Sequence, residues 1–105
     1  MKIRFVGNKA IQASEKHFNG ELDEHQMKLL AKTIIDHKTH LGKSDRSNGS
    51  YAPAYIVWGE VDGITYQLTI DSADIKLGYY TIVSFFDVRN PEHKAKRFNM
   101  KRINK

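Results

Sequence analysis

An Asp-Gly pair between two alternating stretches of apolar and polar residues is the strongest structural signal in this chain. Pro53 to Glu60 and Thr65 to Ile70 flank the tetrapeptide Val61-Asp62-Gly63-Ile64. Asp-Gly accepts the positive backbone angles of a two-residue turn, so the two stretches are predicted to form a β-hairpin. The register that follows from this turn pairs Val61 with Ile64, Gly59 with Tyr66, Val57 with Leu68 and Tyr55 with Ile70.

This register places the hairpin residues on two different faces. The face with Tyr55, Val57 and Leu68 is apolar, and a helix is expected to pack against it. The other face mixes aromatic, aliphatic and hydrogen-bonding groups, and we interpret it as an open binding surface. That second face carries Ile56, Trp58, Glu60, Thr65, Gln67 and Thr69.

The helix expected against the hairpin has a clear start. Asp23 and Gln26 have the spacing of a capping box, and Leu22 and Met27 have that of a hydrophobic staple. The spacing predicts a helix that runs to about His40 and stops near Gly42. Its apolar stripe consists of Met27, Leu30, Ala31, Ile34 and Ile35.

Three further segments complete the expected fold. Met1 to Val6 alternates like a short strand, and Asn8 to Phe18 is compatible with a short helix that has Ile11 and Phe18 on one side. Tyr79 to Val88 is the most hydrophobic stretch and is predicted to be a central strand. We therefore predict one α+β domain over residues 1–90, with the N-terminal strand and one or two helices on one face of a three- to four-stranded antiparallel meander sheet.

The net charge of +5 is concentrated at the end of the chain. Residues 88–105 hold seven Lys or Arg and one Asp or Glu, whereas residues 51–87 have a net charge of −4. We interpret residues 91–105 as a basic tail that attracts a polyanion, most commonly a nucleic acid. The alternatives are a solvated tail without a partner and contact with an acidic protein or a membrane surface. The tail residues expected to contact phosphates are Lys94, Lys96, Arg97, Lys101 and Arg102.

Composition narrows the class of protein further. The chain has no cysteine, which removes disulfides and thiolate zinc sites. Its apolar runs are far shorter than the roughly 20 residues that cross a bilayer, and the amino terminus lacks the long apolar stretch of a signal peptide. We expect no contact with a membrane and a cytoplasmic site of action, with delivery from another cell left open.

The segment His37 to Tyr51, interpreted as a loop, contains most of the groups suited to catalysis. Gly42-Lys43-Ser44 resembles the end of a phosphate-binding loop, but His37 occupies the position of that motif's first glycine. His37 and His40 lack an obvious third metal ligand, so no metal site and no cofactor is predicted. No sharp strand-to-helix turn presents a serine nucleophile.

Metal-independent acid-base chemistry on an RNA phosphodiester remains as the leading hypothesis. His37 and His40 would transfer protons to and from the 2′-hydroxyl and the leaving oxygen, because histidine titrates near neutral pH. Lys43 and Arg46 would stabilise the charge of the transition state. Ser44, Ser84 or a tyrosine would orient the phosphate. On the sheet, Trp58 would stack on an unpaired base; partial burial as a packing residue is the alternative. His17, His25 and His93 are expected at the surface.

The order of elements resembles that of a known group of ribonucleases. A helix followed by a His/Lys-rich segment and by the strands Ala54-Tyr55-Ile56-Val57, Val61 to Leu68 and Tyr79 to Phe86 is similar to the barnase, EndoU, colicin E5/D and RelE superfamily, particularly its phage-encoded and toxin branches. The resemblance covers about residues 22–90. It implies RNA cleavage on the open sheet face, and Glu60 best matches the catalytic glutamate of barnase-like members.

Two other functions fit the same features. A non-catalytic nucleic-acid-binding module would use the tail and Trp58 for binding alone. A phage-type inhibitor or immunity-like protein would use the acidic stretch 51–87 to contact another protein. RNA is the expected partner of a ribonuclease, and a toxin would also need a cognate antitoxin or immunity protein.

Overall fold

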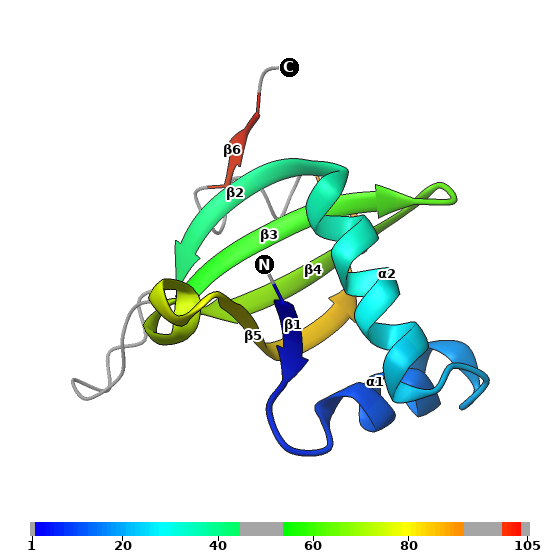
Figure 1. The fold of residues 1–105 in the computed structure, drawn as a ribbon. Helices are drawn as coiled ribbons and strands as arrows, with labels where there is room; N and C mark the ends of the chain where they lie inside the picture. Colours follow the sequence, from blue (N-terminus) through cyan, green and yellow to red (C-terminus); the bar gives the residue numbers. More distant parts are fainter. Residues whose placement is uncertain (1, 45–53, 92–99, 104–105) are drawn as a thin grey trace.

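A computed structural model describes residues 2–44, 54–91 and 100–103 of the chain. These residues form two α-helices that lie on one face of a six-stranded sheet (Figure 1), which confirms the predicted α+β class. In chain order the elements are β1 (Lys2–Phe5), α1 (Lys9–Phe18), α2 (Glu24–Asp36), β2 (Lys38–Ser44), β3 (Ala54–Val61), β4 (Ile64–Asp71), the 3₁₀ helix η1 (Ser72–Leu77), β5 (Tyr79–Asp87) and β6 (Lys101–Arg102).

The sheet is larger than predicted and is mixed. Its strand order over the described residues is β1-β5-β4-β3-β2-β6, and β2 to β5 form an antiparallel meander. The prediction of three to four antiparallel strands was wrong because β1 pairs with the free edge of β5 in parallel, and β6 extends the other edge by pairing with β2. Two residues of the predicted basic tail therefore belong to the sheet, and the boundary at residue 90 stays a prediction.

The hairpin of β3 and β4 confirms the predicted register. Val61 pairs with Ile64, and Gly59, Val57 and Tyr55 pair with the expected partners. Asp62 and Gly63 at the turn have φ angles of 53° and 80°. Two successive positive angles match the right-handed twist of the paired strands, so the turn itself sets which residues share a face.

Helix α2 begins as predicted but ends earlier. Asp23 Oδ1 accepts a hydrogen bond from the Gln26 backbone at 2.8 Å, and Gln26 Oε1 accepts one from the Asp23 backbone at 2.9 Å, so the capping box is confirmed. The helix stops at Asp36, where its apolar stripe runs out after Ile35. Its stripe packs against Val57, Leu68, Ile70 and Ile82 in the main core.

The predicted loop from His37 to Tyr51 was wrong over its first part. Residues 38–44 form β2, which pairs with β3 from Lys38 opposite Gly59 to Ser44 opposite Ala54. Continuing the helix to His40 would add no apolar side chain to its stripe, whereas pairing with β3 places Leu41 beside Val57. Residues 45–51, including Arg46, lie outside the described residues.

Helix α1 exists, but only part of its expected apolar side faces the core. Phe18 packs against the main core as expected, whereas Ile11 is half exposed and the helix buries the small residues Ala10, Ala13 and Ser14. The Ser14 hydroxyl donates to the Leu22 carbonyl at 2.6 Å. These small side chains let the helix backbone approach the core closely, which the larger Ile11 would prevent.

The second face of the hairpin is covered over most of its length, so the prediction of an open surface was wrong. Trp58 and Ile56 form a second core cluster with Val88 and Met100, which follow β5 in the chain. Gln67 and Thr69 on the same face are also buried, whereas Glu60 is exposed near the turn. Val88 and Met100 therefore pack on a face that the hairpin alone leaves open.

No helix among the described residues is both long and apolar enough to cross a membrane.

Candidate functional site

The two histidines proposed for catalysis belong to different elements. His37 is the C-cap residue of α2 and is exposed. His40 lies in β2 directly opposite Trp58, with 5.2 Å between their ring centroids. His40 therefore faces the second core cluster, on the side of the sheet away from α2.

His40 is half-buried and has two polar neighbours. The Thr39 hydroxyl oxygen lies 2.9 Å from His40 Nδ1, and Arg102 in β6 is its direct cross-strand partner. Burial lowers the pKa of His40 below its usual 6.5, and the positive charge of Arg102 lowers it further. The imidazole is therefore held neutral over a wider pH range than a free histidine.

Replacing Arg102 with glutamine should raise the pKa of His40 toward 6.5, with burial still keeping it below that value. Because the unfolded chain binds this proton more readily than the folded one, the free energy of unfolding should fall as the pH drops through 6.5. The Arg102→Gln variant should lose less stability over the same interval. An NMR titration of the His40 ring measures the shift, with Lys16→Gln as the control; equal midpoints in both variants would contradict the contribution of Arg102.

Trp58 is buried rather than available to stack on a base. Its side chain has no exposed area, and its indole N–H donates to Gln67 Oε1 at 2.8 Å. The predicted base contact at Trp58 was therefore wrong, and its packing alternative is confirmed. The residues that cover Trp58 lie more than ten positions beyond the hairpin in the chain. The alternation of residues within the hairpin therefore gave no sign that Trp58 is buried.

Ser84 faces the same side as Trp58 and already has a hydrogen-bond partner. Its hydroxyl donates to Thr69 Oγ1 at 2.6 Å, and the two residues are directly paired. A β-bulge between Ile70 and Thr69 in the β4–β5 ladder changes which β5 residues face each side. Ser84 is therefore engaged within the sheet.

The proposed catalytic set does not come together in the described residues. Lys43 pairs with Tyr55 and His40 pairs with Trp58, so strand alternation directs their side chains to opposite faces of β2. Ser84 is bonded to Thr69, and His37 caps a helix. Arg46 lies outside the described residues, so its predicted role stays a prediction.

The last two strands at one side of the sheet, β2 and β6, form a basic edge. They contain no Asp or Glu, and their cationic residues have no ion-pair partner within the described parts of the chain. Arg102 lies opposite His40 and Lys101 opposite Leu41. We define the basic edge as Lys38, Lys43, Lys101 and Arg102. Strand pairing places Lys43 and Lys101 on the α2 face of the sheet and Arg102 on the opposite face with His40. The predicted contacts Lys94, Lys96 and Arg97 lie outside the described residues.

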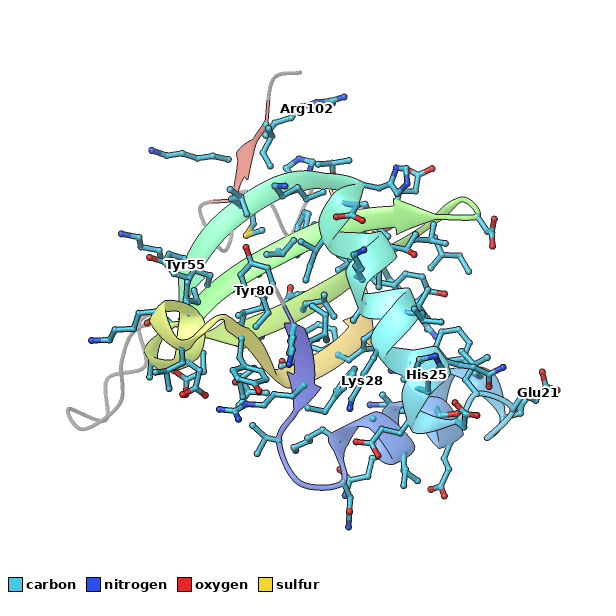
Figure 2. All side chains as sticks on the ribbon, viewed as in Figure 1. Glu21, His25, Lys28, Tyr55, Tyr80 and Arg102 are labelled. Atoms are coloured by element: carbon cyan, nitrogen blue, oxygen red, sulfur yellow. The ribbon has the colours of Figure 1, made fainter. Side chains whose placement is uncertain are left out.

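A groove adjoins the basic edge on the α2 side of the sheet. It has a volume of about 340 Å³. Tyr55 and Tyr80 both line it; Figure 2 shows Tyr55 beside the end of β2 and Tyr80 in the space between η1 and α2. Its lining consists of Ile35, Lys38, Leu41, Tyr55, Val57, Ile70, Ile75 and Tyr80. Sequence patterns did not indicate this groove, because its walls come from elements far apart in the chain.

His17 is a further titratable group that sequence reasoning misplaced. It was expected at the surface, but its side chain is 11% exposed and its Nδ1 lies 3.5 Å from Asp87 Oδ1. Its ring also packs near Phe85, with centroids 6.1 Å apart. Only the tertiary structure brings Asp87 to this helix, 70 positions after His17.

Comparison with protein-family models, with curated proteins and with solved structures found no match to this chain. The resemblance to the barnase, EndoU, colicin and RelE superfamily therefore stays a prediction.

Proposed function

We propose that this protein is a nucleic-acid-binding module that contacts the phosphate backbone of RNA along its basic edge. The observation that carries this proposal is the placement of four cationic residues on two adjacent strands without an acidic residue among them. Cations on a rigid sheet edge attract a polyanion and release its condensed counterions on binding. Binding is therefore expected to weaken steeply as salt increases.

The pairing of acidic residues favours this function over a protein-binding inhibitor. Asp74 is 2.8 Å from Arg4, and hydrogen bonds from Arg4 and then from Thr81 lower the pKa of its carboxyl group. Asp71 caps η1 through the Ala73 backbone, and Asp87 pairs with His17. Three of the five carboxylates in residues 51–87 thus have intramolecular partners, so part of the negative charge of this stretch is already engaged within the chain.

Removing one cation from the basic edge should reduce the salt dependence of RNA binding. Lys43→Gln and Lys101→Gln should each lower the slope of log affinity against log salt by about 0.7 for single-stranded RNA, provided that each lysine contacts one phosphate. Fluorescence anisotropy with a labelled single-stranded RNA at several salt concentrations measures this slope. Lys16→Gln on α1 removes the same charge away from the edge and serves as the control.

Three outcomes of this titration would contradict the proposal. Wild-type protein that binds no RNA at low salt would exclude the function altogether. Equal slopes for wild type, Lys43→Gln and Lys101→Gln would show that the edge is not the contact surface. A slope change in Lys16→Gln as large as in the edge variants would show that only total charge matters.

RNA cleavage is the second candidate function. The observation that favours it is the lowered pKa of His40, because a neutral imidazole beside Arg102 is able to accept a proton from a 2′-hydroxyl. His40 and Lys43 lie on opposite faces of β2, which favours RNA binding without cleavage. Cleavage predicts 2′,3′-cyclic-phosphate products in the presence of EDTA and their loss in His40→Ala; intact RNA across a broad set of substrates would contradict it.

A further inference from the structure

The groove beside the basic edge combines an exposed aromatic ring, an apolar floor and nearby lysines. We propose that it binds an unpaired base of single-stranded nucleic acid, with Tyr55 as the stacking residue. This inference rests on the proposed function and specifies its substrate class, because a base inside a duplex is stacked on its neighbours and cannot enter the groove.

Tyr55 is the residue of the groove best placed to meet a base. It is 37% exposed, although strand alternation places it on the same face as the buried Val57. Tyr80 on β5 is half-buried and lines the same groove. Aromatic rings accept any base because every base has a flat π-face, so such a contact gives preference for single strands without sequence preference.

Lysines lie next to the position that the phosphate of a nucleotide stacked on Tyr55 would take. Lys43 is directly opposite Tyr55 on the neighbouring strand, a relation that places two side chains on one face about 5 Å apart at Cβ. Lys38 lines the groove, and Lys101 is opposite the groove residue Leu41. A base on Tyr55 would therefore leave its own phosphate beside a cation.

The volume and the charge of the groove suit an unpaired base. Its volume of about 340 Å³ is at the small end of ligand sites, which suits one or two planar rings. None of its eight lining residues is acidic. Asp36, Asp71 and Asp74 each adjoin a lining residue in the chain. Asp71 and Asp74 are bonded to the Ala73 backbone and to Arg4, which leaves Asp36 at the end of α2 as the exposed carboxylate of the three.

The test compares a short single-stranded RNA with the duplex of the same sequence. Tyr55→Ala should weaken single-strand binding about five- to 150-fold, the range known for loss of one stacked base. Duplex affinity and the salt slope should stay unchanged, since no phosphate contact is removed. Tyr55→Phe keeps the ring and should bind like wild type, whereas Tyr55→Leu keeps apolar bulk without the ring and should resemble Tyr55→Ala.

A second probe shows whether a base occupies the groove. Removing bases from the single strand to leave an abasic backbone should weaken wild-type binding and have little effect on Tyr55→Ala. Equal losses in both proteins would overturn the inference while leaving the proposed function intact, as would equal affinity of Tyr55→Ala and Tyr55→Phe for the single strand. Wild type that binds neither RNA would overturn both, and would direct attention to an apolar side chain of a partner protein.

Discussion

Replacing Trp58 with alanine should lower the free energy of unfolding by about 3–5 kcal/mol. The indole ring has no exposed area and packs with Ile56, Val88 and Met100, so its removal leaves a cavity. Gln67, which is also buried, would lose the donor that satisfies its Oε1. A typical domain has a total stability of about 5–15 kcal/mol, so this loss is a large part of the whole. Urea denaturation followed by circular dichroism measures it.

Two related variants separate the cavity from the hydrogen bond. Trp58→Phe retains much of the ring and leaves Gln67 unpaired, so it should be less destabilising than Trp58→Ala. Adding Gln67→Leu to Trp58→Phe should recover part of the loss, because both polar partners are then absent. A Trp58→Ala protein with unchanged stability and strongly reduced RNA binding would show instead that Trp58 is a contact residue.

Replacing Gly59 with alanine should destabilise the protein by about 3 kcal/mol. A Cβ at this position would lie 2.2 Å from the Ile34 carbonyl oxygen and 2.9 Å from Ile34 Cγ2. The closest atom belongs to the backbone of α2, so no side-chain rotation relieves the clash. Helix α2 would have to move away from β3 and open the main core. Chemical denaturation measures the loss, and hydrogen exchange should show faster exchange in α2.

Gly63→Ala is the matched control for this clash. Gly63 has a φ of +80°, and a methyl group added there would meet no other atom within 4 Å, so its substitution tests backbone strain alone. That strain costs about 1–2 kcal/mol for a residue with a Cβ. Gly59→Ala equal to or milder than Gly63→Ala would mean that α2 and β3 are not as closely packed as the structure indicates.

The features that could be predicted depend on residues close together in the chain. The capping box joins Asp23 to Gln26, and the hairpin register follows from Asp62 and Gly63. Short-range pairs of this kind carry little loop-closure entropy, so local chemistry decides them. The α+β class followed correctly from these two elements and from the apolar stripe of α2.

The predictions that failed or could not be made concern residues whose neighbours in space are distant in the chain. Residues 38–44 form a strand because β3 pairs along their length and β6 pairs with His40 and Leu41 on the other side. The facing of Ser84 depends on a bulge in the β4–β5 ladder, which strand alternation does not reveal. His17 is enclosed because Asp87 and Phe85 approach it from the other end of the chain.

In the candidate site, too, local features could be predicted from the sequence and contacts between distant segments could not. Sequence alone determined that the C-terminal residues are strongly basic and that Tyr55 shares a face with Val57, since composition and strand alternation are local properties. Tertiary structure decided that Lys101 and Arg102 lie beside β2, that Met100 covers Trp58, and that Tyr55 rather than Trp58 meets solvent. Alternation specifies two faces of a strand, and only the segments that return from elsewhere in the chain decide which face is buried.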